Sequence, residues 1–395
     1  MIQEKNQGAL AGLKILDFST LLPGPYASMV LADLGAEVLR VSAPGKKDAV
    51  EVYPPQIQGE GVTSSQAWLG RNKKTMELNL KKAASVEIVK RLIMEYDIVL
   101  EQFRPGVMKR LGLDYETLKT LNPRLIYCSL TGYGQSGPMR DRAGHDINFL
   151  ALSGNMGQAG RKDGGPVLTN IQIGDVASGA MNAVTGILAA AYYREKTGEG
   201  QYIDIAMLDG LIPFNGMDGS GYLVSQKAPE REGSWLNGGS LYDFYETSDG
   251  RYISVGSIEP KFWKGFCEVM GCEDLIQGGI YPEDGEVVKE RIKGLFLEKT
   301  FDEWCEIFKD QDICVEPVLS MEEAFAENEQ IADRQMIVEV PLNHGTTVKQ
   351  MGNGIKLSET PVQYRHGGYP SGFHTREILE NLGIDEETIT SVTEV

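Results

Sequence analysis

One histidine and one aspartate are the residues of this chain whose types and spacing suggest chemistry. His145 lies in the segment Gly144-His-Asp-Ile-Asn148, and Asp175 follows it after a glycine-dotted stretch. Imidazole gains or loses a proton near neutral pH, and burial or a hydrogen bond shifts the pKa of an aspartate in either direction. Two such groups on opposite sides of one carbon would remove a proton from one face and return it to the other. That chemistry racemises a centre next to a carbonyl.

The same two residues also have an ordinary structural interpretation. His145 stands where a helix would begin, and Asp175 is a good N-cap for a helix beginning at Val176. Spacing alone favours this structural role over catalysis. No Ser-His-Asp order, H-E-x-x-H motif or P-loop pattern occurs, so the common hydrolase, zinc protease and nucleotide hydrolase classes have no support.

Composition limits the classes of partner. The chain has 395 residues, which predicts two domains, and its 42% hydrophobic content is typical of a globular protein. A formal net charge of −18 argues against nucleic acid as a partner, although a local basic pocket could still bind a small anion. No run of eighteen apolar residues occurs, so no membrane span and no membrane partner are expected.

The cysteines and the N-terminus indicate a cytoplasmic protein. Five cysteines at wide spacings, without C-x-x-C, predict neither a disulfide framework nor a structural zinc site. Such a pattern suits a reducing compartment. Residues 1–7 contain no apolar segment, so we expect no signal peptide.

The elements that must position the candidate residues form an α/β pattern. Residues 13–41 read as strand, turn, helix and strand, which predicts a βαβ unit. Residues 75–101 show a second strand, helix and strand pattern of the same kind. A strand at 125–130 leads through the glycine-rich loop 131–138 towards His145. Ligands bind outside the carboxyl ends of such strands. The glycines do not spell G-x-G-x-x-G, so no nicotinamide cofactor is supported.

Two basic features are candidates for binding phosphate. Arg71-Asn-Lys-Lys74 is either a solvated turn or a phosphate clamp made by charged donors. Arg104 follows directly on a strand at its carboxyl end, and it is either a phosphate ligand or a loop arginine paired with a carboxylate.

Beyond residue 215 the character of the chain changes. The segment 216–239 is rich in loop residues and resembles a connection, and 242–255 reads as a β-hairpin. Helices to about residue 310 and a short strand at 314–318 complete a small α+β domain. We therefore expect a large domain in 1–215, a small domain in 216–330, and a C-terminal segment, 331–395, that returns to the large domain.

Ten short segments together resemble a known family, and the similarity as a whole runs from about residue 10 to about residue 382. In chain order they are Leu22-Pro-Gly-Pro-Tyr26, Leu31-Ala-Asp-Leu-Gly-Ala-Glu-Val38, Glu101-Gln-Phe-Arg-Pro-Gly106, Asn122-Pro-Arg-Leu-Ile-Tyr127, Thr131-Gly-Tyr-Gly-Gln-Ser-Gly137, Gly144-His-Asp-Ile-Asn148, Gly174-Asp175, Thr197-Gly-Glu-Gly-Gln201, Gly256-Ser-Ile-Glu-Pro260 and Cys314-Val-Glu-Pro-Val318. They resemble the family III CoA-transferase superfamily (the CaiB/BaiF group), and within it the α-methylacyl-CoA racemases.

The resemblance implies a fold and a substrate. It implies a Rossmann-like large domain built from both ends of the chain, a smaller α+β domain, and a homodimer of two interlocked subunits. The substrate would be an acyl-CoA thioester. No separate cofactor and no metal are expected, because CoA is part of the substrate. The implied CoA-binding residues are Arg40, Arg71, Lys74, Arg104, Tyr133 and Gly144.

The resemblance also implies catalytic roles. In the racemases, His145 and Asp175 would exchange the α-proton of a 2-methylacyl-CoA through an enolate, and Glu259 would tune His145. Backbone N–H groups near Asp175 and at Val176 would stabilise the enolate. In the transferases, Asp175 would instead be the nucleophile that moves CoA between carboxylic acids. Both activities therefore remain open, and the matching histidine and glutamate favour the racemase.

Overall fold

The computed structural model describes residues 8–395, and the segment 1–7, on which the expectation of no signal peptide rests, lies outside the described residues. The chain divides into two compact units. Unit 1 contains the residues up to Leu152, Asn170–Ile212 and Gln330–Val395. Unit 2 contains Ser153–Thr169 and Pro213–Glu329. The segment Ser153–Thr169 therefore joins unit 2, although it precedes the boundary that we expected at residue 215.

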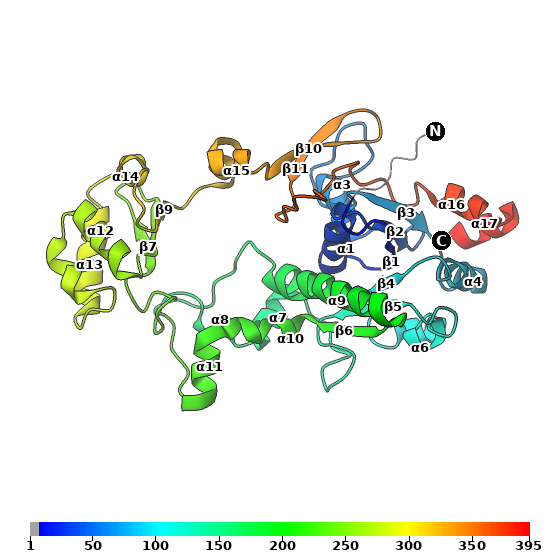
Figure 1. Ribbon diagram of the computed structural model, residues 1–395, viewed down its shortest axis with the longest axis horizontal. Helices are drawn as coiled ribbons and strands as arrows, with labels where there is room; N and C mark the ends of the chain where they lie inside the picture. Colours follow the sequence, from blue (N-terminus) through cyan, green and yellow to red (C-terminus); the bar gives the residue numbers. More distant parts are fainter. Residues whose placement is uncertain (1–7) are drawn as a thin grey trace. The chain divides into compact units, whose positions relative to one another are not determined.

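Unit 1 is built on a six-stranded parallel sheet in the order β3-β2-β1-β4-β5-β6 (Figure 1). The strands are β1 (Lys14–Asp17), β2 (Glu37–Ser42), β3 (Lys73–Glu77), β4 (Ile98–Glu101), β5 (Ile126–Thr131) and β6 (Tyr202–Ala206). Buried residues run nearly unbroken along β4 and β5, as a sheet covered on both faces requires. The predicted α/β class is confirmed, and the strand order is that of a doubly wound Rossmann-like sheet.

The helices of unit 1 alternate with these strands. They are α1 (Pro23–Asp33), α2 (Ala49–Val52), α3 (Ser64–Leu69), α4 (Ala83–Leu92), α5 (Val107–Leu111), α6 (Tyr115–Leu118), α7 (Asp146–Leu152), the π-helix η1 (Gly174–Ala180), α9 (Met181–Thr197) and α10 (Met207–Leu211). The last part of the chain adds the hairpin β10 (Ile337–Pro341) and β11 (Thr347–Met351), and the helices α16 (Thr375–Asn381) and α17 (Glu386–Thr393). Leu379, Ile389 and Val392 of α16 and α17 belong to the hydrophobic core of unit 1.

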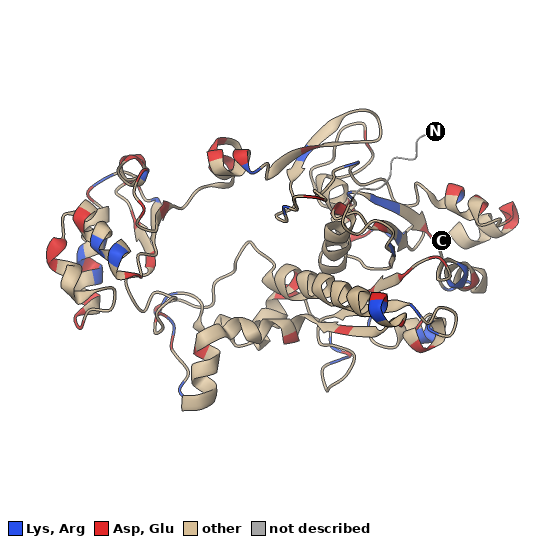
Figure 2. Cartoon of the chain, in the orientation of Figure 1, with Lys and Arg blue, Asp and Glu red and all other residues tan. Residues whose placement is uncertain are grey.

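Unit 2 is built on a three-stranded antiparallel sheet in the order β7-β8-β9. The strands are β7 (Asp243–Glu246), β8 (Tyr252–Val255) and β9 (Val315–Pro317). The predicted hairpin and the predicted short strand are thus confirmed. Its principal helices are α8 (Asn155–Gln158), α11 (Gly216–Ser225), α12 (Pro260–Met270), α13 (Gly285–Phe296) and α14 (Phe301–Phe308). Lys and Arg lie among Glu side chains on α13 (Figure 2). No helix in the described part of the chain is long and apolar enough to cross a membrane.

Candidate active site

A cavity of about 330 Å³ lies where the strand order of unit 1 reverses, between β1 and β4. Its lining residues come from the loops after β1, β4 and β5 and from the segments that lead into α7 and α10. They are Thr20, Leu21, Gln102, Phe103, Arg104, Pro105, Thr131, Gly132, Tyr133, Arg140, Arg142, Ala143, Gly144, His145, Phe149 and Met207. Ligands of open α/β sheets bind at this switch point. The structure therefore brings His145, Arg104, Tyr133 and Gly144 together around one cavity.

Two glycines shape one wall of the cavity. The ring of Phe149 packs so closely that a Cβ on Gly132 would lie 2.5 Å from it, and a Cβ on Gly144 would lie 2.6 Å from it. The same Cβ on Gly144 would lie 2.7 Å from the hydroxyl oxygen of Tyr133, whose ring meets Phe149 edge to face at 5.2 Å. Bare backbone is thus required at both positions, and it lets the loop approach a ligand closely.

His145 stands immediately before α7. Its backbone N–H donates to Oδ1 of Asn148 at 3.0 Å, and its carbonyl accepts from the N–H of Asn148 at 2.8 Å. The expected helix start is therefore present, but it uses only backbone atoms of His145. The imidazole is exposed, lines the cavity, and forms no hydrogen bond with the residues that the structure describes. A free imidazole in a cavity wall is available to exchange protons.

Asp175 is not the N-cap that spacing suggested. The helix begins at Gly174, two residues before the expected start at Val176, with Ile173 as its N-cap, so Asp175 lies inside the first turn of η1. Its side chain makes no capping hydrogen bond there. The first turn is a π-helix that continues into α9, and π-helical turns are frequent at functional sites. The structural interpretation of Asp175 as a helix cap is thus wrong.

The environment of Asp175 favours the protonated carboxyl. Burial, followed by the negative charge of Asp146, raises the pKa of Asp175 to about 6, whereas the charge of His145 acts in the opposite direction. Asp175 is therefore near enough to both residues to feel their charges. A carboxyl with a pKa near the working pH is suited to both accepting and donating a proton. Asp175 itself is not among the residues that line the cavity.

The backbone donors expected to stabilise an enolate are already occupied. The N–H of Asp175 donates to Oδ1 of Asp146 at 3.0 Å, and the N–H of Val176 donates to the carbonyl of Gln172 at 2.9 Å. That expectation is therefore wrong, because a helix start next to an acidic side chain satisfies its own donors.

Positive charge around the cavity comes from more residues than the sequence suggested. Arg104 is exposed and lines the cavity, as expected of a residue at the carboxyl end of β4. Arg140 and Arg142 line it too, and sequence reasoning missed both. Arg140 lies 3.7 Å from Oδ1 of Asp141, the only carboxylate paired with the three guanidinium groups in the described residues. The sequence did contain a signal for them, because two arginines directly before the candidate base His145 are unusual in a strongly acidic chain.

The basic segment from Arg71 to Lys74 is not a solvated turn. Arg71 is buried and holds Asp33 with two bonds, of 3.0 and 2.6 Å. Lys73 is also buried, and its Nζ donates to the carbonyl of Pro25 at 2.7 Å. Only Lys74 is exposed, and it lies 3.6 Å from Glu377. Composition could not tell a buried arginine or lysine of this segment from an exposed one, because the burial of Arg71 and Lys73 depends on residues that are distant in the sequence.

Two further polar groups lie near the carboxyl ends of the strands. Arg40, at the end of β2, is buried and pairs with Asp48 at 3.0 Å and Glu51 at 2.9 Å. Glu101 ends β4 and accepts from the N–H of Phe103 at 2.8 Å and from the hydroxyl of Ser129. Burial raises the pKa of Glu101 to about 7. Neither Arg40 nor Glu101 lines the cavity.

Glu259 belongs to unit 2, where it is the N-cap of α12 and is exposed. Its carboxylate makes no capping hydrogen bond, so its structural role as a helix cap is limited to its backbone.

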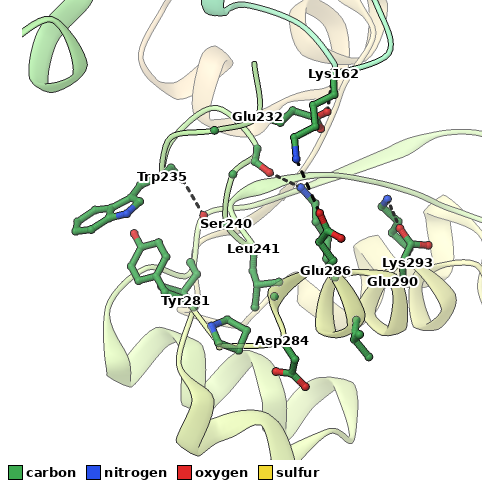
Figure 3. Close-up of a pocket in the computed structure, with 18 of the residues that line it drawn as sticks. Lys162, Glu232, Trp235, Ser240, Leu241, Tyr281, Asp284, Glu286, Glu290 and Lys293 are labelled. Atoms are coloured by element: carbon green, nitrogen blue, oxygen red, sulfur yellow. Dashed lines mark hydrogen bonds and ion pairs between the residues drawn. The ribbon is translucent and has the colours of Figure 1, made fainter. Parts of the chain in front are cut away.

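A second and larger cavity, of about 940 Å³, lies in unit 2 (Figure 3). Trp235 lies beside Tyr281 there, with ring centroids 4.7 Å apart. Two ion pairs join charged groups of its lining: Lys293 lies 2.6 Å from Glu290, and Lys162 lies 3.9 Å from Glu286.

No group of three or more His, Cys, Asp or Glu side chains that could hold a metal ion occurs among residues 8–395. An exposed imidazole and a carboxyl that titrates near neutral pH lie in a cationic setting. Such a site suits proton transfer on an anionic substrate.

Comparison with known proteins connects this site to described activities. The model of the family described as CoA-transferase family III matches residues 10–375. The chain is 34% identical over 390 residues to the Homo sapiens alpha-methylacyl-CoA racemase, covering 96% of this chain and 95% of that protein. It is 33% identical over 390 residues to the Mus musculus succinyl-CoA:glutarate CoA-transferase, covering 96% and 88%.

The solved structures agree with the sequence matches. The crystal structure of a CaiB/BaiF family protein from Brucella suis superimposes with a TM-score of 0.82 at 27% identity, covering 95% of this chain and 99% of that chain. The racemase and the transferase named above match this chain to a similar degree. The identities therefore do not decide between the two activities, and the choice depends on the residues of the site.

Proposed function

The chain belongs to CoA-transferase family III, and from this premise we propose that it is an acyl-CoA racemase that inverts the α-carbon of a 2-methylacyl-CoA. The observation that carries the proposal is that the charge of His145 acts on the carboxyl of Asp175. An exposed imidazole lines the cavity, and a carboxyl whose pKa is about 6 lies close enough to feel its charge. A nucleophilic aspartate would need no histidine at this place.

The proposed reaction moves one proton on and one proton off the α-carbon. The thioester carbonyl makes the α-hydrogen acidic. His145 takes that proton, the electron pair of the C–H bond moves into the carbonyl to form an enolate, and protonated Asp175 delivers its proton to the opposite face. The opposite epimer reacts with the two roles exchanged. Because the pKa of Asp175 is about 6, its carboxyl can both donate and accept the proton at a working pH near this value.

The cavity supplies the electrostatic setting. Arg104, Arg140 and Arg142 surround it with positive charge, which favours both a phosphate-bearing substrate and a negatively charged enolate. We place CoA along this wall, where Gly144 and Tyr133 permit close approach. Lys74 is exposed and lies 3.6 Å from Glu377, but it does not line this cavity, so its contact with CoA would be made outside it. Arg40 and Arg71 would contact CoA only by giving up their carboxylate partners.

Two parts of the proposal rest on the family resemblance. Glu259 would hydrogen-bond near His145 and tune it, and two copies of the chain would form an interlocked dimer. Removing the Glu259 carboxylate should then lower activity and leave unit 2 folded, because that carboxylate makes no capping bond. A protein that is fully active as a monomer would contradict the dimer.

The second candidate is a CoA-transferase in which Asp175 is the nucleophile. Its support is the transferase relative, which matches almost as well as the racemase. In that reaction Asp175 attacks the thioester carbonyl, CoA leaves as a thiolate, and an aspartyl anhydride forms. The thiolate then attacks the aspartyl carbonyl of the anhydride, which forms an aspartyl-CoA thioester and releases the donor carboxylate. The acceptor carboxylate attacks this thioester, so that CoA leaves again as a thiolate and a second anhydride forms. Attack of the thiolate on the acceptor's carbonyl gives the new acyl-CoA and restores Asp175. The ionised form of Asp175 would be required, and the environment that raises its pKa works against that form.

One experiment tests the proposal against this alternative. The protein is incubated in D₂O with one epimer of a 2-methylacyl-CoA and no acceptor acid, and deuterium and configuration are followed together. The racemase incorporates deuterium at the α-carbon as the configuration is lost. Absence of exchange, combined with transfer of CoA once a free carboxylic acid is added, would refute the racemase and establish the transferase.

A further inference from the structure

Asp146 links the two candidate bases. It is the next residue after His145 and the first residue of α7. Its Oδ1 accepts the backbone N–H of Asp175 at 3.0 Å, although the two residues are far apart in the sequence. The carboxylate of Asp146 therefore ties the start of α7, which carries His145, to the start of η1, which carries Asp175.

Gly174 makes this contact possible. A Cβ on Gly174 would lie 2.9 Å from Oδ1 of Asp146 and 3.6 Å from its carboxyl carbon. Any side chain at Gly174 would therefore push Asp146 away from the N–H of Asp175. At the start of η1, the N–H of Asp175 has no acceptor within its own helix, and the carboxylate of Asp146 from α7 accepts it. Gly174 leaves the space that this carboxylate needs.

The charge of Asp146 acts on the Asp175 carboxyl as well. After burial, Asp146 is the principal cause of the raised pKa of Asp175, because two nearby carboxylates resist ionising together. His145 acts in the opposite direction. The same side chain therefore places Asp175 by a hydrogen bond and biases its protonation by its charge.

The other elements packed against η1 carry few groups that compete with this effect. Apart from α7, these elements are α1, α9, α10 and β6, and their titratable residues are Tyr26, Asp33, Tyr192, Tyr193, Arg194, Glu195, Lys196, Tyr202, Asp204 and Asp209. Asp33 is neutralised by Arg71 at 2.6 Å. The charges that shift the pKa of Asp175 are those of Asp146 and His145.

We propose that Asp146 is a positioning residue for α-proton exchange, which holds Asp175 by accepting its backbone N–H at the start of η1. This inference rests on the proposed racemase function. Asp146, like Asp175, is absent from the residues that line the cavity. Its effect passes entirely through Asp175.

Two substitutions separate the hydrogen bond from the charge. Asp146→Asn keeps an oxygen that can accept from the N–H of Asp175 but removes the negative charge. Asp146→Ala removes both. Asp333→Asn is the matched control, because Asp333 is an exposed aspartate of the same unit. Gly174→Ala displaces Asp146 without altering any charge.

The first readout does not depend on activity. Proteins labelled with ¹³C at the aspartate carboxyl are titrated by NMR, and the Asp175 signal is assigned by its absence in Asp175→Asn. We expect Asp146→Asn to lower the pKa of Asp175 by about one unit, the usual effect of removing one nearby like charge. Asp333→Asn should leave it unchanged. An Asp175 titration that is the same in Asp146→Asn and in the wild type would overturn the electrostatic effect of Asp146 on Asp175.

The second readout is the pH profile of deuterium exchange. The limb that belongs to Asp175 should move to lower pH by a similar amount in Asp146→Asn. Asp146→Ala and Gly174→Ala should also lose kcat, by about ten- to a hundredfold, because Asp175 is no longer held in place. Equal kcat values in Asp146→Ala and Asp146→Asn would overturn the proposed positioning role.

The two readouts also separate this inference from the proposed function. If the wild-type protein exchanges no α-proton while Asp146→Asn lowers the pKa of Asp175, the racemase function fails and the link between the two aspartates stands. If the wild type exchanges the α-proton while both readouts are unaffected by Asp146→Asn and Asp146→Ala, the function stands and Asp146 has no part in it.

Discussion

Replacing Asp175 by asparagine should stabilise the protein at neutral pH while lowering its racemase activity by about 10²–10⁴-fold. The pKa of Asp175 rises from 3.8 to about 6 on folding, chiefly because of burial. The folded protein therefore binds this proton more tightly than the unfolded chain does. Stability is lost as the pH rises from about 4 to about 6, and the full penalty is present above that window. Asparagine cannot ionise, so Asp175→Asn escapes the penalty.

The size of the effect follows from the shift. A rise of about two units corresponds to about 3 kcal/mol of unfolding free energy. Asp175 is only partly buried, so screening by solvent reduces this to about 2 kcal/mol. For a cooperative unit of this size, about 2 kcal/mol moves the melting temperature by about 4–8 °C. The difference between variant and wild type should be near zero at pH 4 and reach this value by pH 7.

The assay is a set of melting curves of wild type and Asp175→Asn at half-unit steps from pH 4 to pH 8, read by circular dichroism. Asp333→Asn serves as the control, because it changes an exposed carboxylate in the same unit. All other titrating groups are shared and cancel in the difference. A difference in melting temperature that is constant across this range would refute the reasoning, because it would show that folding does not perturb the Asp175 carboxyl.

Three further predictions concern the surroundings of the site. Gly144→Ala should lower kcat/KM about ten- to a hundredfold in steady-state kinetics, because its Cβ would displace the cavity wall. Arg71→Ala should lower the free energy of unfolding in urea by about 3–5 kcal/mol, because it leaves Asp33 buried without its partner. As a comparison, Lys74→Ala should change the free energy of unfolding by less than about 0.5 kcal/mol and raise KM for acyl-CoA. Glu101→Gln should melt higher than the wild type at pH 8 but not at pH 4, because the pKa of Glu101 is raised to about 7 and its ionisation above that pH destabilises the fold.

Each of these has a result that would contradict it. Unchanged kinetics in Gly144→Ala would show that the wall does not contact substrate. An Arg71→Ala protein as stable as the wild type, with a raised KM, would make Arg71 a CoA ligand rather than a structural group. A stability difference for Glu101→Gln that is the same at pH 4 and pH 8 would show that Glu101 ionises as freely in the folded protein as in the unfolded chain.

The parallel sheet was predictable because its signals are local. Residues 13–41 and 75–101 each place short strands on either side of one helix, and a right-handed crossover then leaves few arrangements. The hairpin of β7 and β8 was predictable from its turn for the same reason. The position of a cavity at the strand ends also followed from the fold class, and Arg104 was found by that route.

What the sequence could not reveal depends on contacts between distant residues. Arg71 and Lys73 read as charged surface, but their carboxylate and carbonyl partners lie far away in the chain and draw them inside. Asp146 looked like a neighbour of His145 and became a partner of Asp175 only through folding. The π-helical first turn that moves Asp175 from a cap into the helix has no signature in residue types.

The central claim is that His145 and Asp175 serve opposite faces of the same carbon. The most direct test is deuterium exchange with each pure epimer of a 2-methylacyl-CoA, using His145→Ala and Asp175→Asn. In each variant the rate of racemisation should fall by about 10²–10⁴-fold, but the α-proton of one epimer should still exchange with retention of configuration. The epimer that exchanges in His145→Ala should be the opposite of the one that exchanges in Asp175→Asn. If both variants exchange the same epimer, or if His145→Ala still racemises at the wild-type rate, the two-base account is wrong.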